Sequence, residues 1–198
     1  EAGRQLDSLV FMGMGEPFMN WANVKKSVLL LSDNKGYNFP QPRITVSTVG
    51  IVPVIRELAE SHLEIRLAVS LITTDEKQRA GLTPMSKKYS LREVIGGARY
   101  YTDRTKKMVF FEYILFDGLN DSAEGARKLL ALIKDIPCKV NLIMYNPVPG
   151  GTFTPGRFEK GKEFQAVLVE AGIRTHMRRE KGADIAAACG QLAGDADY

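Results

Sequence analysis

The sequence predicts an α/β fold in which parallel strands alternate with helices. Strand-like and helix-like segments alternate along the 198 residues, and the apolar content of 44% and charged content of 25% are those of a globular protein. Alternation of this kind places the strands in one parallel sheet, joined by right-handed helical crossovers. No apolar run reaches about 18 residues, so no membrane span is expected. We find no repeat or linker, so residues 1–198 are expected to form a single domain.

The strands are expected where β-branched and aromatic residues concentrate between turn-forming residues. These segments are residues 9–14, 43–48, 65–71, 108–115, 139–145 and 174–178. Apolar residues three and four positions apart predict helices between them, at residues 24–31, 54–59, 91–98, 126–133 and 164–171, with a short helical turn at 184–188. Ser90 and Glu93 form a capping box that marks the start of the third helix. Five or six βα units result, which fits an open or partial barrel, because a full eight-unit barrel needs about 250 residues.

Ligands in such folds bind at the carboxyl ends of the strands, where this chain gathers small and polar residues. Residues 13–17, Gly-Met-Gly-Glu-Pro, follow the first strand. The glycines allow a close approach of backbone to ligand, and Glu16 offers a carboxylate to an ammonium group. Asp117, Asn120 and Asp121 follow the fourth strand. A βα protein without a ligand site would also place turn-forming residues at the ends of its strands, and that alternative stays open here.

The two cysteines differ in their surroundings. Cys138 begins a strand and is expected in the core, whereas Cys189 is flanked by alanines and a glycine, so a bulky partner can reach its sulfur. Arg178, Arg179 and Lys181 precede Cys189 and would favour its reactive thiolate, although a buried inert thiol is the alternative. Two cysteines 51 positions apart cannot ligate an iron–sulfur cluster or zinc by themselves, so no metal-binding residue is expected. Their scarcity suits the reducing cytoplasm.

The formal net charge of +4 and the isoelectric point of about 9.0 permit an anionic partner such as nucleic acid. Basic residues cluster at 87–88, 104–107 and 174–181. The last cluster is a candidate phosphate-facing patch, and a solvated charged face is the alternative for the first two.

Four separated motifs together resemble the RlmN/Cfr family of radical S-adenosylmethionine (SAM) RNA methyltransferases. They are Phe11-Met12-Gly13-Met14-Gly15-Glu16-Pro17, Thr45-Val46-Ser47-Thr48, Asn141-Leu142-Ile143 with Tyr145-Asn146-Pro147-Val148-Pro149-Gly150, and Asp184 with Ala187-Ala188-Cys189-Gly190-Gln191-Leu192-Ala193-Gly194. The resemblance implies a partial (βα) barrel of the radical SAM type. It also implies methylation of an adenine in large-subunit ribosomal RNA, with transfer RNA as a further substrate of some members. The chain would comprise most of the radical SAM core plus the segment with the methyl-carrying cysteine.

The resemblance also assigns roles to individual residues. Cys189 matches the cysteine that one SAM molecule methylates before a second SAM supplies a radical. Gly15 and Glu16 would bind the SAM amino group, with Ser47, Ser70 and Asn146 contacting other parts of SAM. In the family a C-x-x-x-C-x-x-C loop holds a 4Fe-4S cluster, which an electron donor such as flavodoxin or ferredoxin reduces in the cytoplasm. We expect no membrane partner.

The chain departs from the family pattern in two ways. The cluster loop and a second, resolving cysteine are absent, so the chain resembles the carboxy-terminal part of a longer enzyme without its first βα unit. We expect it to be inactive alone, to bind no iron, and to self-associate through an unpaired strand edge. Ile72 stands where the family usually has a histidine. A non-catalytic SAM- or RNA-binding module and an unrelated βα enzyme of small metabolites remain as alternative hypotheses.

Overall fold

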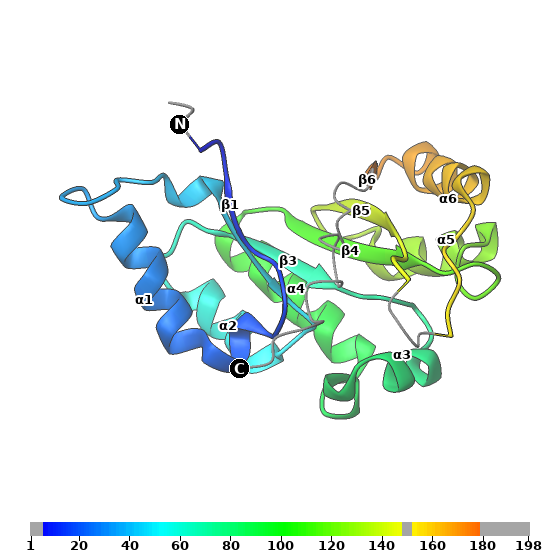
Figure 1. The fold of residues 1–198 in the computed structure, drawn as a ribbon, viewed down its shortest axis with the longest axis horizontal. Helices are drawn as coiled ribbons and strands as arrows, with labels where there is room; N and C mark the ends of the chain where they lie inside the picture. The colour runs from blue at the N-terminus through cyan, green and yellow to red at the C-terminus, as the bar shows by residue number, and fades with distance from the viewer. Residues whose placement is uncertain (1–5, 148–151, 179–198) are drawn as a thin grey trace.

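The structure is a computed structural model that describes residues 6–147 and 152–178. These residues build one six-stranded sheet in which neighbouring strands are parallel and follow the order of the sequence (Figure 1). The expected α/β class with five or six βα units is confirmed. The strands are β1 (Leu9–Phe11), β2 (Ile44–Thr48), β3 (Arg66–Ser70), β4 (Val109–Leu115), β5 (Cys138–Met144) and β6 (Arg174–Arg178).

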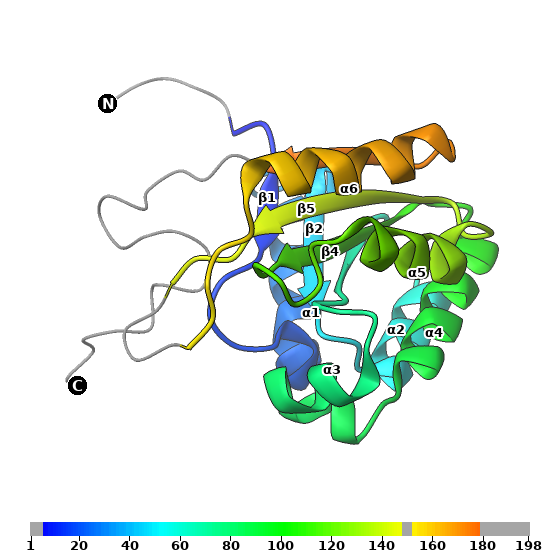
Figure 2. The same cartoon turned by 90° about the vertical axis from the view of Figure 1, so that its right-hand side faces the viewer.

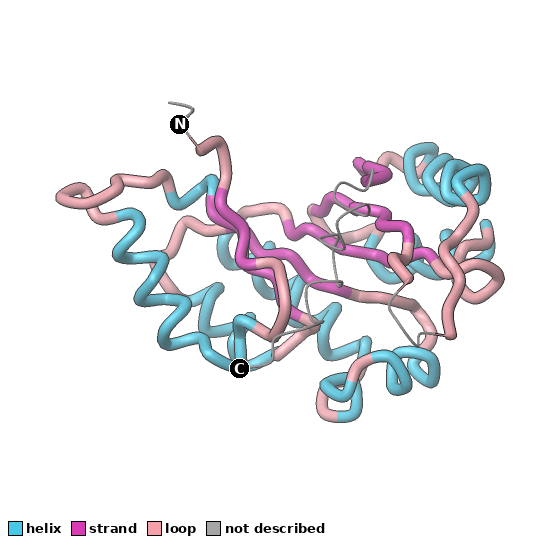
Figure 3. The backbone as a smooth tube through the Cα atoms, in the orientation of Figure 1, coloured by secondary structure: helices cyan, strands magenta, loops and turns pink. Residues whose placement is uncertain are grey.

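Helices connect consecutive strands, as Figure 3 shows by colour. The five helical stripes read from the sequence are confirmed, and so is the Ser90–Glu93 capping box. One helix was not predicted, α3, because it is short and has little apolar periodicity; only its cap Asp75, which accepts from the Gln78 N–H, marks its start. The helices are α1 (Trp21–Ser32), α2 (Val52–Glu60), α3 (Glu76–Leu82), α4 (Leu91–Thr105), α5 (Ala123–Ile133) and α6 (Phe158–Glu170), with 3₁₀ turns η1 (Pro17–Asn20), η2 (Gln41–Arg43) and η3 (Pro84–Lys87).

The predicted boundaries of β2 to β6 agree with the observed ones to within one residue at each end. The prediction of a strand over residues 9–14 was wrong for its second half, since β1 ends at Phe11. The chain leaves the sheet there and turns at Gly15, whose φ of 90° is a conformation that glycine adopts without strain. The final strand, β6, spans residues 174–178 as predicted.

The core lies between the sheet and its helices, and Figure 2 shows α6 running alongside β5. Alternate strand residues such as Ile44, Val46 and Phe111 are fully buried against these helices. α6 covers the same face, because its Phe164 ring packs 5.1 Å from the Tyr113 ring. Cys138 is 6% exposed, so its assignment to the core is confirmed.

The opposite side of the sheet is called the open face below. Its side chains alternate with the core residues and are mostly half-buried or exposed. They include Thr45, Ser47, Ser70, Phe110, Glu112, Ile114, Lys139, Asn141, Arg174, His176 and Arg178. β1 and β6 form the two edges of the described sheet. Among the described residues, no helix is both long and apolar enough to cross a membrane.

Candidate functional site

A cavity of about 170 Å³ lies on the open face at the carboxyl ends of the strands. Four residues expected to bind the cofactor line it, which brings together segments more than 50 positions apart: Gly15, Glu16, Ser47 and Ser70. Parallel strands all end at the same edge, so the loops after β1, β2 and β3 meet there. The expected gathering of polar groups at this rim is therefore present.

The Glu16 carboxylate is built into the cavity wall. Its Oε1 accepts a hydrogen bond of 2.9 Å from the Phe18 N–H and caps η1, while its Oε2 accepts one of 2.7 Å from the Val49 N–H. The sequence predicted a carboxylate that binds a ligand ammonium group, so this structural role is a finding of the fold. Each carboxylate oxygen has a second lone pair, so Glu16 keeps acceptor capacity for a ligand ammonium.

Ser47 and Ser70 lie on neighbouring strands with their Oγ atoms 3.5 Å apart. Both hydroxyls are half-buried on the open face, where they can donate to or accept from a ligand hydroxyl or carboxylate. Asn146 follows β5 and is 6% exposed, and it is not among the lining residues of this cavity. The structure therefore brings together four of the five residues expected to bind the cofactor.

Arg79 supports the cavity from behind and was not identified from the sequence. Its side chain is fully buried, and its guanidinium donates to the carbonyl oxygens of Val49 at 2.8 Å and Tyr89 at 2.9 Å. Burial lowers the pKa of Arg79, and the Glu76 carboxylate opposes that shift. An arginine in a short polar segment carries no local signal of burial, so only the tertiary structure reveals this role.

Glu112 and Asn141 form a second polar feature, for which the sequence predicted no role. They lie opposite each other on β4 and β5, and Asn141 Nδ2 donates to Glu112 Oε1 at 2.8 Å. Glu112 is 7% exposed and lines the cavity together with Arg178. Burial raises the pKa of Glu112, while the Asn141 hydrogen bond and the Arg178 charge oppose that rise. A glutamate in the otherwise apolar segment 108–115 was a signal for this site.

The polar residues after β4 do not line this cavity. Asn120 accepts from the Phe116 N–H at 2.9 Å and donates to the carbonyls of Ile114 and Ile72, which holds the ends of β3 and β4 together. Asp117 binds Lys160 at 3.0 Å, and this ion pair lowers the pKa of Asp117. These residues therefore stabilise the loops after β4. This is what the alternative hypothesis predicted, in which the polar residues Asp117, Asn120 and Asp121 only form turns.

Other candidates fall outside the cavity or outside the described residues. Cys189 lies outside residues 6–147 and 152–178, as do Arg179, Lys181 and the helical turn expected at 184–188, so its assignment stays a prediction. Within the described ranges, no three histidine, cysteine or acidic side chains cluster as metal ligands. Burial raises the pKa of the Cys138 thiol to about 11.

The basic clusters differ in their partners. In the cluster 104–107, Arg104 pairs with Glu60 at 3.2 Å and Lys107 with Glu64 at 2.9 Å. Lys107 is half-buried, and the other three side chains are exposed. This arrangement supports the solvated-face alternative for that cluster. In contrast, Arg178 of the last cluster lines the cavity.

Comparisons with known proteins agree with this architecture. The model of the radical SAM superfamily matches residues 2–130. The chain is 42% identical over 193 residues to "Dual-specificity RNA methyltransferase RlmN 2" of Myxococcus xanthus (strain DK1622), covering 98% of this chain and 51% of that protein. It is also 42% identical to "Dual-specificity RNA methyltransferase RlmN" of Granulibacter bethesdensis (strain ATCC BAA-1260 / CGDNIH1), covering 97% of this chain and 48% of that protein. The chain thus spans about half the length of the curated relatives it matches.

Two solved structures share the fold. A crystal structure of a radical SAM methyltransferase from Sphaerobacter thermophilus superposes with a TM-score of 0.94 at 41% identity, covering 98% of this chain and 57% of that one. A domain of pyruvate-formate lyase-activating enzyme from Bacteroides vulgatus ATCC 8482 gives a TM-score of 0.66 at 13% identity, covering 88% of this chain and 100% of that domain. The second likeness concerns the fold alone.

Proposed function

The chain belongs to the radical SAM superfamily, and from this membership we propose that it is part of an enzyme that methylates an adenine of large-subunit ribosomal RNA and of transfer RNA. The observation that carries the proposal is the convergence of Gly15, Glu16, Ser47 and Ser70 on one cavity. The printed names of the two relatives, each 42% identical over nearly the whole chain, support RNA as the substrate. A cytoplasmic location accompanies this substrate.

The groups that line the cavity are of the kinds that bind SAM. Glu16 offers a carboxylate to the ammonium group, Ser47 and Ser70 offer hydroxyls to polar groups, and two isoleucines, Ile114 and Ile143, add apolar surface for a purine. Asn146 would contact SAM from the end of β5. When bound, SAM supplies a methyl group and the source of a carbon-centred radical. The residues of this chain orient it and shield it from water.

The 4Fe-4S cluster of the family does not fit the residues at hand. The chain has two cysteines, and no three-residue metal group occurs in residues 6–147 and 152–178. Three thiolates are needed, so we assign the cluster ligands to residues outside this chain. An electron donor such as flavodoxin or ferredoxin belongs to the same proposal.

Cys189 is the proposed methyl carrier. A thiolate is a strong nucleophile, and a cysteine sulfur that holds the transferred carbon replaces a bimolecular encounter by a fixed geometry. Cys138 cannot take this role, because its thiol is buried and its pKa is about 11. The adenine must leave its stack to reach such a site, as in other enzymes that modify bases.

The test compares the two cysteines in the intact gene product. Cys189→Ala is expected to abolish methylated adenine, measured by mass spectrometry of digested RNA, while the cluster still assembles by its visible absorption. Cys138→Ala is the matched control and is expected to retain methylation. Methylation by Cys189→Ala would refute the assignment. RNA binding that falls steeply with salt but yields no methylated product in the wild type would favour a non-catalytic module.

A further inference from the structure

We propose that a second cavity, at the amino ends of the strands, binds a nucleotide of the RNA substrate other than the target adenine. The base of this nucleotide stacks on Phe110, and Arg66 and Lys139 hold its phosphate. This inference rests on the proposed function and adds a site that the cofactor cavity does not supply. The two cavities have no lining residue in common, so each can be tested without disturbing the other.

The second cavity lies at the opposite end of the open face from the cofactor cavity. It has a volume of about 290 Å³, and Pro42, Met108 and Phe110 form its apolar wall. Phe110 is the second residue of β4, whereas Ile114, which lines the cofactor cavity, is the sixth. A strand rises about 3.3 Å per residue, so about 13 Å of β4 separates these two residues. The second cavity is therefore a separate site.

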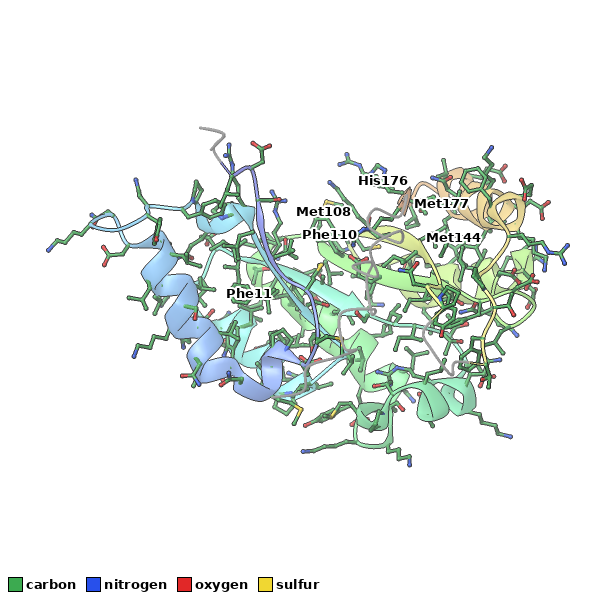
Figure 4. All side chains as sticks on the ribbon, viewed as in Figure 1. Phe11, Met108, Phe110, Met144, His176 and Met177 are labelled. Atoms are coloured by element: carbon green, nitrogen blue, oxygen red, sulfur yellow. The ribbon has the colours of Figure 1, made fainter. Side chains whose placement is uncertain are left out.

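Phe110 provides a surface on which a base can stack. Its side chain is half-buried on the open face, and Figure 4 shows it next to Met108 at the start of β4. Its direct partner on β3 is Ala68, whose single methyl group is too small to cover the ring. Sheets that bind RNA use an aromatic side chain on their face in this way, because every base has a flat face that can stack.

The charged groups around Phe110 suit a phosphate. Lys139, the partner of Phe110 on β5, places its Nζ 5.6 Å from the centroid of the ring. Arg66 and Lys107 also line the cavity, and Lys107 is paired with the Glu64 carboxylate at 2.9 Å. Arg66 and Lys139 form no ion pair with any residue that the structure describes, so their charges are available to a ligand.

Exposed cations on β6 connect the two cavities. Arg174 lies beside Lys139, and Arg178 lies beside Ile143 in the wall of the cofactor cavity. Both arginines are exposed on an edge of the described sheet. Cations in a row attract successive phosphates of one strand, so RNA that reaches the cofactor cavity is expected to pass Arg174 on its way to Phe110. An acidic peptide would satisfy the cations but would leave the aromatic surface unused, so the chemistry favours RNA.

The first experiment measures the affinity of the intact gene product for unmodified transfer RNA. Phe110→Leu keeps an apolar side chain but removes the aromatic face, and it is expected to weaken binding about tenfold. Its affinity for SAM is measured alongside and is expected to stay unchanged, since Phe110 does not line the cofactor cavity.

The matched control is Phe158→Leu on α6. The Phe158 ring is also partly exposed, and it also has a lysine near it, because Lys162 Nζ lies 4.8 Å from its centroid. This variant is expected to bind RNA like the wild type.

Salt dependence separates the phosphate contacts from stacking. Arg66→Gln and Lys139→Gln each remove one phosphate contact, so each is expected to reduce the slope of log affinity against log salt concentration by about 0.7. Phe110→Leu is expected to keep the wild-type slope. Lys162→Gln is the control for the loss of an exposed charge and is also expected to keep it.

A photochemical cross-link tests the site in the wild type. Transfer RNA with 5-iodouracil in place of uracil is irradiated with the protein, and mass spectrometry of the digest is expected to find a cross-link on Phe110. Oligoadenylate is expected to prevent this cross-link better than inorganic polyphosphate at equal phosphate concentration, since polyphosphate has no base to stack. Circular dichroism shows whether Phe110→Leu is folded, and the cross-link decides the question if it is not.

Several results would overturn the inference. A cross-link only at other residues is one, and an unchanged RNA affinity of folded Phe110→Leu is another. Equal competition by polyphosphate would show that the cations act alone. Equal competition by polyglutamate would assign the cavity to an acidic protein, and equal competition by AMP would assign it to a free nucleotide.

The proposed function can fail separately. A wild type that cross-links through Phe110 but forms no methylated adenine would support the second site and refute the methylation. A wild type that methylates RNA while Phe110→Leu binds RNA equally well would refute the second site alone.

Discussion

Glu16 accepts a hydrogen bond of 2.7 Å from the Val49 N–H, which ties the loop after β1 to the end of β2. The carbonyl of the same peptide residue accepts a hydrogen bond of 2.8 Å from Arg79. Val49 is therefore held from both sides, by a carboxylate in the cavity wall and by a guanidinium in the core. The shape of the cavity depends on these two side chains as much as on the strands.

Removing the Glu16 carboxylate should loosen this wall. Glu16→Ala leaves the Phe18 and Val49 N–H groups without their acceptor, and we expect a loss of about 2 kcal/mol in the free energy of unfolding. Urea unfolding of the chain measures this loss. Glu163→Gln, an exposed change on α6, is the control and should have no effect. A Glu16→Ala variant as stable as the control would show that these hydrogen bonds contribute nothing net.

Arg79→Met should be more damaging than Glu16→Ala. The methionine side chain keeps the apolar volume but leaves two half-buried carbonyls, those of Val49 and Tyr89, without the Arg79 donors. We expect a loss of about 3 kcal/mol by urea unfolding. Arg92→Met is the matched control, because Arg92 is exposed on α4. Equal effects of the two substitutions would contradict the supporting role of Arg79.

Ile72 adopts a φ of 66°, which is strained for a β-branched residue, and its carbonyl accepts from Asn120 Nδ2 at 3.1 Å. Ile72→Gly and Ile72→Ala remove nearly the same side chain, but only glycine relieves the strain. We expect the free energy of unfolding of Ile72→Gly to exceed that of Ile72→Ala by about 1 kcal/mol. At ordinary backbone positions the alanine variant is the more stable of the two. Thermal unfolding of the two variants measures the order. An alanine variant that is the more stable would argue against strain at this turn.

Stability should depend on pH through Glu112. Burial raises its pKa above the ordinary 4.5, so the folded state binds the proton more tightly than the unfolded state. This contribution is complete below the unfolded pKa and is lost as pH rises through the folded pKa. The stability of the wild type relative to Glu112→Gln should therefore decline from about pH 4.5 upwards. Urea unfolding at a series of pH values measures it, and a constant difference would contradict the raised pKa.

Periodicity predicted most of the fold because each buried strand and amphipathic helix carries its pattern locally. The capping box at Ser90 and the final strand at residues 174–178 were found in this way. α3 was missed, since its buried residue is an arginine, Arg79, which no hydrophobic pattern reveals. The predicted first strand was too long, because apolar residues continue beyond Phe11, where the chain leaves the sheet before it turns at Gly15.

The sequence by itself determined the order of strands and helices, the family resemblance and the identity of the polar residues at the strand ends. Only the tertiary structure decided that Glu16 braces Val49, that Ser47 and Ser70 lie 3.5 Å apart, and that Glu112 pairs with Asn141. The physical reason is register. A shift of one residue in the pairing of β4 with β5 would turn Asn141 to the other face, and local sequence does not encode that alignment.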